Sequence, residues 1–209
     1  MIRRNHLIVF AKEPRIGRVK RRLAAEIGSV AATFWYRRQL ANLLHRLNGA
    51  EPWHRHLFVT PGTARAKPIW PQGWTHHAQG SGDLGARMRH ALAAPSSGPV
   101  VLIGSDIPDI KPHHIRAAFR ALARADMVLG PAHDGGYWLI GMRRRRKPPP
   151  FGPVRWSGPH AMADTVEGFG RHNKVLLLET LADVDVVGDL TVARFRTPDQ
   201  RLHAHADEA

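Results

Sequence analysis

Cationic side chains crowd the segment that follows the first apolar run of the sequence. Four of them and one glycine have the types and spacing that a diphosphate needs: Lys12, Arg15, Gly17, Lys20 and Arg22. Guanidinium groups bind phosphate oxygens in pairs, an ammonium adds a point charge, and a glycine lets the backbone approach a ligand closely. The spacing is not that of a Walker A loop, which requires Gly-x4-Gly-Lys-Ser/Thr. The segment fits a phosphate-binding loop of another kind, and the alternative is a basic loop that only meets solvent.

An aspartate lies just beyond an apolar run at residues 100–103 (VVLI), within the sequence GSDIP of residues 104–108. A carboxylate held at the end of a buried strand could bind Mg²⁺ or Mn²⁺. Such ions typically take one or two carboxylates and complete their coordination with substrate phosphates and water. Asp106 is therefore a candidate metal ligand, and the alternative is an aspartate that only shapes the turn before Pro108.

Two further segments are rich in glycine. In residues 79–85 (QGSGDLG), Gly82 would let the backbone pack against a planar base or a sugar, whereas Asp83 equally fits a simple helix cap. Residues 133–138 (HDGGYW) combine a carboxylate, two glycines and two aromatic rings, as is common where a sugar or an acceptor is held. Asp134 could act as a general base toward an acceptor hydroxyl. Packing in the core is the alternative for the two aromatic rings.

Short apolar runs alternate with helical spacing and predict the elements that position these segments. We expect helices around Leu40–Leu47, after Asp83 and from Pro112 onward. Strands are expected at residues 6–11, 56–60, 100–103, 127–130, 137–141 and 175–178. This order predicts an α/β fold with a mostly parallel sheet and helices on both faces. Ligands of such sheets bind beyond the carboxyl ends of the strands, where the four segments fall.

The composition is that of a globular enzyme-sized chain. With 209 residues, 43% of them hydrophobic and 23% charged, we expect a single domain over residues 1–202 and a frayed tail at 203–209. Residues 143–150 (RRRRKPPP) predict a surface loop. No apolar run is long enough to span a membrane, and the absence of cysteine suits the cytoplasm. Nothing in the sequence indicates the oligomeric state.

The net charge is +14 with histidine neutral, from 31 Lys and Arg against 17 Asp and Glu. Such a field attracts polyanions, including nucleic acid, phosphates and nucleotides. The cations are concentrated in one loop and one arginine run, without a recognition module or interleaved stacking aromatics. These features disfavour a nucleic-acid-binding protein, and we expect no specific nucleic-acid partner.

Together the four segments resemble a known family. The blocks FAKxPxxGxxKxRL (10–23), QGxGDLGxRM (79–88), GSDIP (104–108) and GPAxDGGYWLIG (130–141) are similar to the radical-SAM/selenodomain-associated transferases. That family belongs to the GT-A superfamily of nucleotide-diphospho-sugar transferases. The resemblance covers residues 8 to about 190 and implies a Rossmann-like, three-layer sandwich that binds a nucleotide and a divalent metal ion.

The resemblance also implies roles for individual residues. Lys12, Arg15, Lys20 and Arg22 would be phosphate ligands, and Asp106 would bind Mg²⁺ or Mn²⁺. The sugar or the acceptor would lie against a wall formed by Asp134, Gly135, Gly136 and Tyr137.

Two departures from the family pattern affect these expectations. Arg21 stands where the family has threonine, and the usual Asp-x-Asp is only Gly104-Ser105-Asp106. A second metal-binding carboxylate must therefore come from elsewhere. Asp183-Val-Asp185 resembles the start of the carboxyl-terminal motif of related nucleotidyltransferases, which makes Asp185 the candidate second ligand.

These expectations favour a metal-dependent glycosyltransferase that moves a sugar from a nucleoside diphosphate sugar to a small hydroxyl acceptor. The alternative on the same fold is a nucleotidyltransferase, which would release pyrophosphate.

Histidine pairs such as His113-His114 have no third ligand at a zinc-site spacing, although these two follow the Asp106 segment closely enough to contact a substrate.

Overall fold

The computed structural model describes residues 5–49, 51–143, 151–156 and 158–189. Most of the predicted surface loop and the predicted tail at 203–209 lie outside these residues. Six helical segments lie with both ends inside these residues: α1 (Arg21–Ile27), α2 (Ser29–Arg46), the 3₁₀ helix η1 (Gly62–Ala66), α3 (Leu84–Ala93), α4 (Pro112–Ala121) and α5 (Ala161–Phe169). Seven strands are described: β1 (Asn5–Lys12), β2 (Trp53–Thr60), β3 (Thr75–Ala78), β4 (Val100–Ile103), β5 (Met127–Pro131), β6 (Tyr137–Met142) and β7 (Val175–Leu177).

The seven strands form one sheet in the order β3-β2-β1-β4-β6-β5-β7. The pairs β1–β2, β1–β4, β2–β3 and β5–β7 are parallel, and β6 is antiparallel to both of its neighbours. Every strand except β6 therefore ends at the same edge of the sheet, and β6 begins there. The prediction of a mostly parallel α/β fold is confirmed.

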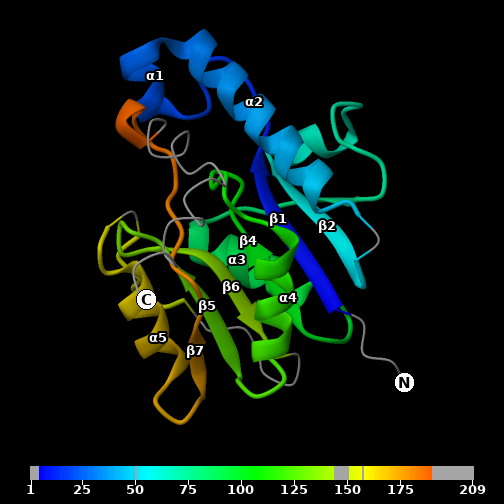
Figure 1. Ribbon diagram of the computed structural model, residues 1–209, viewed down its shortest axis with the longest axis vertical. Coiled ribbons are helices and arrows are strands. Elements are labelled where there is room, and N and C mark those ends of the chain that lie inside the picture. The colour runs from blue at the N-terminus through cyan, green and yellow to red at the C-terminus, as the bar shows by residue number, and fades with distance from the viewer. Residues whose placement is uncertain (1–4, 50, 144–150, 157, 190–209) are drawn as a thin grey trace, which may run out of the picture.

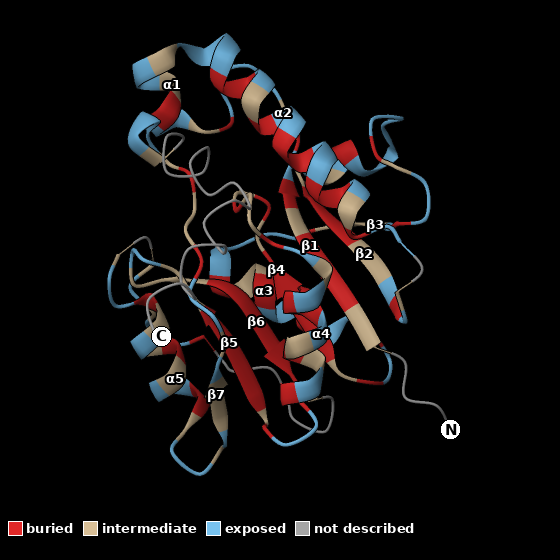
Figure 2. Ribbon diagram, in the orientation of Figure 1, coloured by how far each residue is buried: buried red, intermediate tan, exposed pale blue. Residues whose placement is uncertain are grey.

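Helices cover both faces of the sheet, as Figure 1 shows. One core cluster joins strand residues such as Leu7 and Val101 to Leu43 of α2 and Ile115 of α4. A second cluster joins Ile8 and other residues of the opposite face to α3 and α5. The central strands are buried along most of their length (Figure 2). These two cores make a three-layer sandwich, because alternate side chains of each strand point to opposite layers.

The predicted helices form, and α3 packs closely at its first turn. Asp83 caps α3 by accepting a hydrogen bond from the Ala86 backbone N–H at 2.7 Å, as expected. Met88 and Leu92 are buried, but Leu84 is exposed, and Gly85 occupies the buried position of the first turn. A Cβ at Gly85 would lie 2.7 Å from Phe151, so this turn packs too closely for a side chain.

Three elements lack a strong signal in the sequence. Arginines begin α1 and only Leu23 is buried there, so it has almost no apolar periodicity. The edge strand β3 contains two histidines and is four residues long. Helix α5 has a buried face at Ala161, Thr165 and Phe169, and the middle residue of that face is polar. Each element forms because tertiary packing supplies what local preference does not.

None of the helices in the described part of the chain combines the length and apolar character that a bilayer crossing needs. At the carboxyl edge of the sheet, the segment after β7 runs past the strand ends and finishes beside α1 (Figure 1). A hydrogen bond of 3.0 Å from the Val187 backbone N–H to Glu26 Oε2 joins the two. Loops from distant parts of the sequence thus meet at one edge.

Candidate functional site

A lysine lies between two aspartates at the carboxyl edge of the sheet. Lys20 Nζ is 2.9 Å from Asp106 Oδ2 and 2.9 Å from Asp185 Oδ1. The Lys20 side chain is only 4% exposed, whereas the two carboxylates remain 46% and 38% exposed. Because both oxygens contact the same nitrogen, they can be no further apart than twice this distance. The two predicted metal ligands, far apart in the sequence, therefore converge on one point.

The electrostatics keep Lys20 and Asp185 ionised. Burial alone would disfavour the charged form of Lys20, but Asp106 and Asp185 more than offset this and raise its pKa. Burial likewise opposes ionisation of Asp185, yet Lys20 and then Arg22 lower its pKa overall. The Arg22 guanidinium is 3.1 Å from Asp185 Oδ2 and is 70% exposed. Cations and carboxylates therefore alternate across this site, with carboxylate groups still open to solvent.

The backbone around Lys20 has an unfavourable conformation. Lys20 has φ 46° and ψ 53°, a left-handed conformation that costs energy for a residue with a side chain. It is the residue from which α1 begins, and the ammonium also lies 5.9 Å from the centre of the Trp35 ring. Three interactions, with Asp106, Asp185 and Trp35, thus compensate an unfavourable backbone.

A buried tyrosine, which the sequence analysis missed, supports the loop that carries Asp106. Tyr36 Oη accepts a hydrogen bond from the Lys12 backbone N–H at 2.9 Å and lies 3.0 Å from Ser105 Oγ. Ser105 Oγ in turn lies 3.4 Å from Asp106 Oδ1. Burial and the charge of Asp106 raise the pKa of Tyr36, so its hydroxyl stays protonated. Tyr36 therefore links the ends of β1 and β4, and its regular helical spacing in α2 gave no sign of this role.

A turn fixes the segment that carries Asp185. Asp189 Oδ2 accepts hydrogen bonds from the backbone N–H groups of Asp185 and Val186, at 2.8 and 2.9 Å. Asp189 lies four residues after Asp185 in the chain. It acts here through the backbone and leaves the Asp185 carboxylate free to meet Lys20 and Arg22.

Two more carboxylates border the cluster. Burial raises the pKa of Asp183, and the charges of Asp134 and Asp185 raise it further. Asp134 thus lies close enough to Asp183 to repel it, on the loop between β5 and β6. Its Oδ1 accepts a hydrogen bond from the Gly136 backbone N–H at 2.8 Å, and the side chain is exposed. The predicted general base therefore lies near the predicted metal ligands.

The remaining cations of the first loop face solvent. Lys12 is exposed at the end of β1, and Arg15 is 59% exposed with Glu13 3.7 Å away. Gly17 has φ 74°, and a Cβ there would meet no atom within 4 Å. The loop needs Gly17 for its backbone conformation, and the space beside it is open to a ligand. The structure thus brings Lys20 and Arg22 into the aspartate cluster, while Lys12 and Arg15 remain exposed on the same loop.

The glycine-rich loop before α3 has a well-defined structural role. Gly82 has φ 89°, and a Cβ there would lie 3.0 Å from the Ala86 side chain. Asp83 caps α3 in the way described above, which uses one of its carboxylate oxygens. Contact of Gly82 and Asp83 with a nucleotide stays a prediction.

In the predicted sugar wall, the two glycines make backbone contacts, whereas Tyr137 packs through its side chain. Gly135 has φ 83°, and a Cβ there would lie 2.4 Å from Pro159 Cα, so this backbone contact admits only glycine. Gly136 presents its N–H to Asp134. Tyr137 packs against the second core cluster, with its hydroxyl 3.3 Å from Thr165 Oγ1, and burial raises its pKa to about 12. These contacts give Tyr137 a packing role, and a sugar contact by this wall stays a prediction.

The fold and these contacts define a class of protein: an α/β fold of the kind found in nucleotide-diphospho-sugar transferases and nucleotidyltransferases. The chain belongs to the DUF2064 family, described as uncharacterised proteins conserved in bacteria, whose model matches residues 43–158. The finer assignment to the radical-SAM/selenodomain-associated transferases stays a prediction. Comparison with curated proteins gives no match.

Solved structures support the assignment to this fold class. A provisionally named nucleotide-diphospho-sugar transferase from Desulfovibrio desulfuricans G20 is 33% identical, with a TM-score of 0.84 over 97% of this chain and 91% of that one. The 4-diphosphocytidyl-2C-methyl-D-erythritol synthase of Anaerococcus prevotii DSM 20548 is 13% identical, with a TM-score of 0.61 over 91% and 94%. Rv0371c of Mycobacterium tuberculosis H37Rv, solved in complex with manganese, is 16% identical, with a TM-score of 0.53 over 91% and 97%. The last two show likeness of fold alone.

Proposed function

We propose that this protein is a divalent-metal-dependent glycosyltransferase that moves a sugar from a nucleoside diphosphate sugar to a small hydroxyl acceptor. The observation that carries the proposal is the convergence of Asp106 and Asp185 on Lys20, at 2.9 Å each, at the carboxyl edge of the sheet. Ligands of open α/β sheets bind at that edge. The 33% identical relative carries the name of the same class of transferase.

The residues present fit a hard divalent cation. Asp106 and Asp185 already enclose one positive charge, the Lys20 ammonium, and their carboxylate oxygens are the donors that Mg²⁺ and Mn²⁺ prefer. When bound, such an ion would neutralise the charge that develops on the departing diphosphate. We expect the ammonium to turn from the carboxylates toward a phosphate oxygen when the ion is present.

The protein's own side chains would perform the remaining tasks. Lys20 and Arg22 would hold the diphosphate by charge and hydrogen bonding, and the exposed Arg15 would attract it. Asp134 would accept the proton of the acceptor hydroxyl, because its exposed carboxylate lies near the cluster and keeps one oxygen beyond its bond to Gly136.

A nucleotidyltransferase is the second candidate, and a specific observation favours it. Asp185 belongs to the segment that resembles the nucleotidyltransferase ending, and it is this segment that reaches Lys20 and Arg22. In that reaction an acceptor phosphate would attack a nucleoside triphosphate, and pyrophosphate would leave. Both candidates need the same phosphate and metal groups, so the products separate them.

The first experiment is a thermal-shift screen of nucleoside diphosphates, triphosphates and nucleotide sugars, each with and without Mn²⁺. A site ligand at 100 times its Kd should stabilise the fold by about 2.7 kcal/mol, or roughly 5–10 °C in Tm. Nucleotides that give a Mn²⁺-dependent shift are then incubated with acceptor pools, and release of nucleoside diphosphate or of pyrophosphate is measured. Nucleoside diphosphate indicates sugar transfer, and pyrophosphate indicates nucleotidyl transfer.

Matched variants distinguish binding at the proposed metal site from general attraction of anions. Asp106→Asn should abolish the metal-dependent part of the shift, whereas Asp109→Asn, further along the same loop, should retain it. Inorganic pyrophosphate at equal ionic strength controls for the attraction of any polyanion to a chain of net charge +14. Equal shifts for every anion, indifferent to Mn²⁺ and to Asp106, would refute both candidates.

A further inference from the structure

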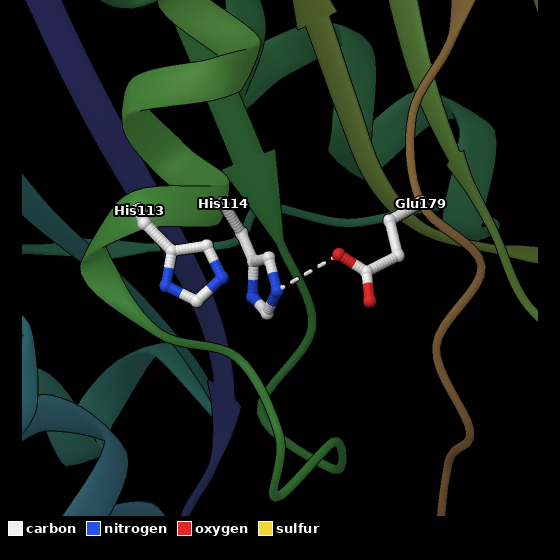
Figure 3. A group of neighbouring side chains, drawn as sticks. All are labelled: His113, His114 and Glu179. Atoms are coloured by element: carbon white, nitrogen blue, oxygen red, sulfur yellow. Dashed lines mark ion pairs between the residues drawn. The ribbon is translucent and has the colours of Figure 1, made fainter. Parts of the chain in front are cut away.

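Two histidines and a glutamate lie together outside the Lys20 site. His113 and His114 stand in the first turn of α4, and Glu179 follows β7 closely in the chain (Figure 3). Each residue offers one ligand atom, and the three atoms lie within 4.8 Å of one another. Glu179 is far from both histidines in the sequence, which is why their spacing alone gave no third ligand.

The distances approach those of a metal centre. Zinc binds histidine nitrogen and carboxylate oxygen at about 2.0–2.2 Å, so two ligands at the tetrahedral angle lie about 3.3–3.5 Å apart. His114 Nε2 and Glu179 Oε2 are 3.3 Å apart. His113 is exposed, so its ring can close the remaining gap without disturbing the core. A fourth position would remain for water.

Neighbouring contacts hold two of these side chains in place. The His114 ring is 8% exposed and packs edge-on against His113, with ring centres 4.0 Å apart, and against Trp138 at 5.7 Å. Trp138 Nε1 donates a hydrogen bond to the Glu179 backbone carbonyl at 3.0 Å. One buried tryptophan therefore positions both the histidine ring and the chain that carries the carboxylate, which is how supporting residues orient metal ligands.

The proton positions define what an ion must displace. The Lys111 backbone N–H donates to His114 Nδ1 at 3.1 Å, so the neutral ring carries its proton on Nε2, facing Glu179. An ion at Nε2 takes the place of that proton, and the ring is then protonated at Nδ1. The bond from Lys111 is then lost, and the ring has to turn as the ion binds, because its new Nδ1–H would otherwise face the Lys111 backbone N–H at 3.1 Å.

We propose that His113, His114 and Glu179 form a binding site for a divalent transition metal of the zinc type. Two imidazoles select such an ion over Mg²⁺, which prefers oxygen ligands. The site is distinct from the Asp106–Asp185 pair and does not depend on the proposed transferase activity. Bound metal would join α4 to the segment that leads to Asp183 and Asp185, and it would stabilise the fold.

The test is a zinc titration of the full chain after dialysis against a chelator, with a chromophoric indicator as competitor. We expect one tight equivalent, and a rise in Tm of roughly 5–10 °C at 100 times its Kd. Cobalt should give the visible absorption of a tetrahedral site. His113→Ala and Glu179→Gln should each weaken zinc binding at least tenfold, because even loss of a supporting residue costs about 10–100-fold.

Controls separate this site from the other histidines of the chain. His172→Ala removes an exposed histidine before β7 and should leave the tight equivalent unchanged, as should Asp106→Asn. Far-UV circular dichroism of the metal-free variants shows whether they fold, and His113→Ala changes an exposed side chain. Unchanged zinc affinity in His113→Ala, equal competition by Mg²⁺, or weak binding shared by all variants would each overturn the proposal.

Discussion

Two regions of the sheet carry titratable groups arranged in opposite ways. At the carboxyl edge, Lys20 lies between Asp106 and Asp185. Across β1, β2 and β3, histidines form a row: His6 Nδ1 lies 3.0 Å from His56 Nε2, and His56 Nδ1 lies 3.1 Å from His77 Nε2. Around Lys20, unlike charges lie side by side. In the histidine row, every group would carry a positive charge if it were protonated.

The contrast decides which region can act on a charged ligand. Burial lowers the pKa of His56 to about 4, and its histidine neighbours contribute to the shift, so this histidine stays neutral at pH 7. Around Lys20, each ion stabilises the charge of its neighbour. Only the arrangement around Lys20 keeps full charges in a confined space, where they act most strongly. The number of charges in the sequence is therefore a poorer guide to the site than their pairing.

The largest effect should follow removal of the central ammonium. In Lys20→Met we expect transferase turnover at fixed Mn²⁺ to fall roughly 100- to 1,000-fold, the usual cost of one group that stabilises developing charge. Mn²⁺ alone should bind more tightly than in the parent, because the ammonium no longer competes for Asp106 and Asp185. Turnover and Mn²⁺ titrations measure the two opposite changes.

Arg18→Met is the matched control for this variant, since Arg18 is an exposed cation of the same loop. It should change turnover only slightly. If both variants lost activity equally, general attraction by the basic loop would explain binding, and the contrast between the two regions would fail. Tighter Mn²⁺ binding in Lys20→Met alone would confirm that the ammonium occupies the position of a cation.

A smaller effect is expected at the histidine row, in the dependence of stability on pH. The pKa of His56 is lower in the folded chain than the ordinary value near 6.5, so the unfolded chain binds the proton more readily. Its contribution to stability is therefore full above about pH 6.5 and is lost as the pH falls toward 4. After discounting for partial exposure, we expect this histidine to account for about 2 kcal/mol.

Urea unfolding of the parent and of His56→Gln, at a pH slightly above 7 and at one between 4 and 5, measures this contribution. As the pH is lowered, the free energy of unfolding should decrease less in His56→Gln than in the parent. The variant also loses ring contacts, which lowers stability at both pH values and cancels in the comparison. Identical slopes would mean that acid sensitivity arises elsewhere, for example from the carboxylates around Lys20.

Sequence patterns predicted most of the sheet, because buried strands such as β4 are short continuous apolar runs. They also indicated the loops of the site, since Lys20, Asp106 and Asp134 each follow a strand. The pairing of Lys20 with both aspartates could not be predicted, because it depends on the left-handed backbone of Lys20 and on the path of the chain after β7. Asp185 was a candidate only through a resemblance, and the structure brings it to Lys20.

Residues with two plausible uses were the hardest to assign. Tyr36 fits the regular spacing of its helix and yet supports the Asp106 loop through Ser105. Tyr137 was predicted to contact a sugar or an acceptor, which stays a prediction, and its ring packs against the second core cluster. His114 is a helix residue whose partner, Glu179, lies far along the chain. In each case the contacts depend on side-chain direction and on residues far along the chain, and neither is encoded in local periodicity.

The smallest predicted effect tests whether the carboxyl edge holds excess negative charge that a cation can neutralise. Burial, with the charges of Asp134 and Asp185, raises the pKa of Asp183, so the folded chain holds this proton more tightly than the unfolded chain. Ionised Asp183 thus costs stability above its folded pKa, and the cost disappears at low pH. Asp183→Asn should raise stability at pH 7 by no more than about 1 kcal/mol, or roughly 2–4 °C in Tm, and leave it unchanged near pH 3. Saturating Mn²⁺ should cancel the gain, because the parent then neutralises the same charge with the bound ion. Calorimetry at both pH values, with and without Mn²⁺, measures these differences. If Asp183→Asn were less stable than the parent at pH 7, favourable contacts would hold the Asp183 carboxylate, and the prediction would be wrong.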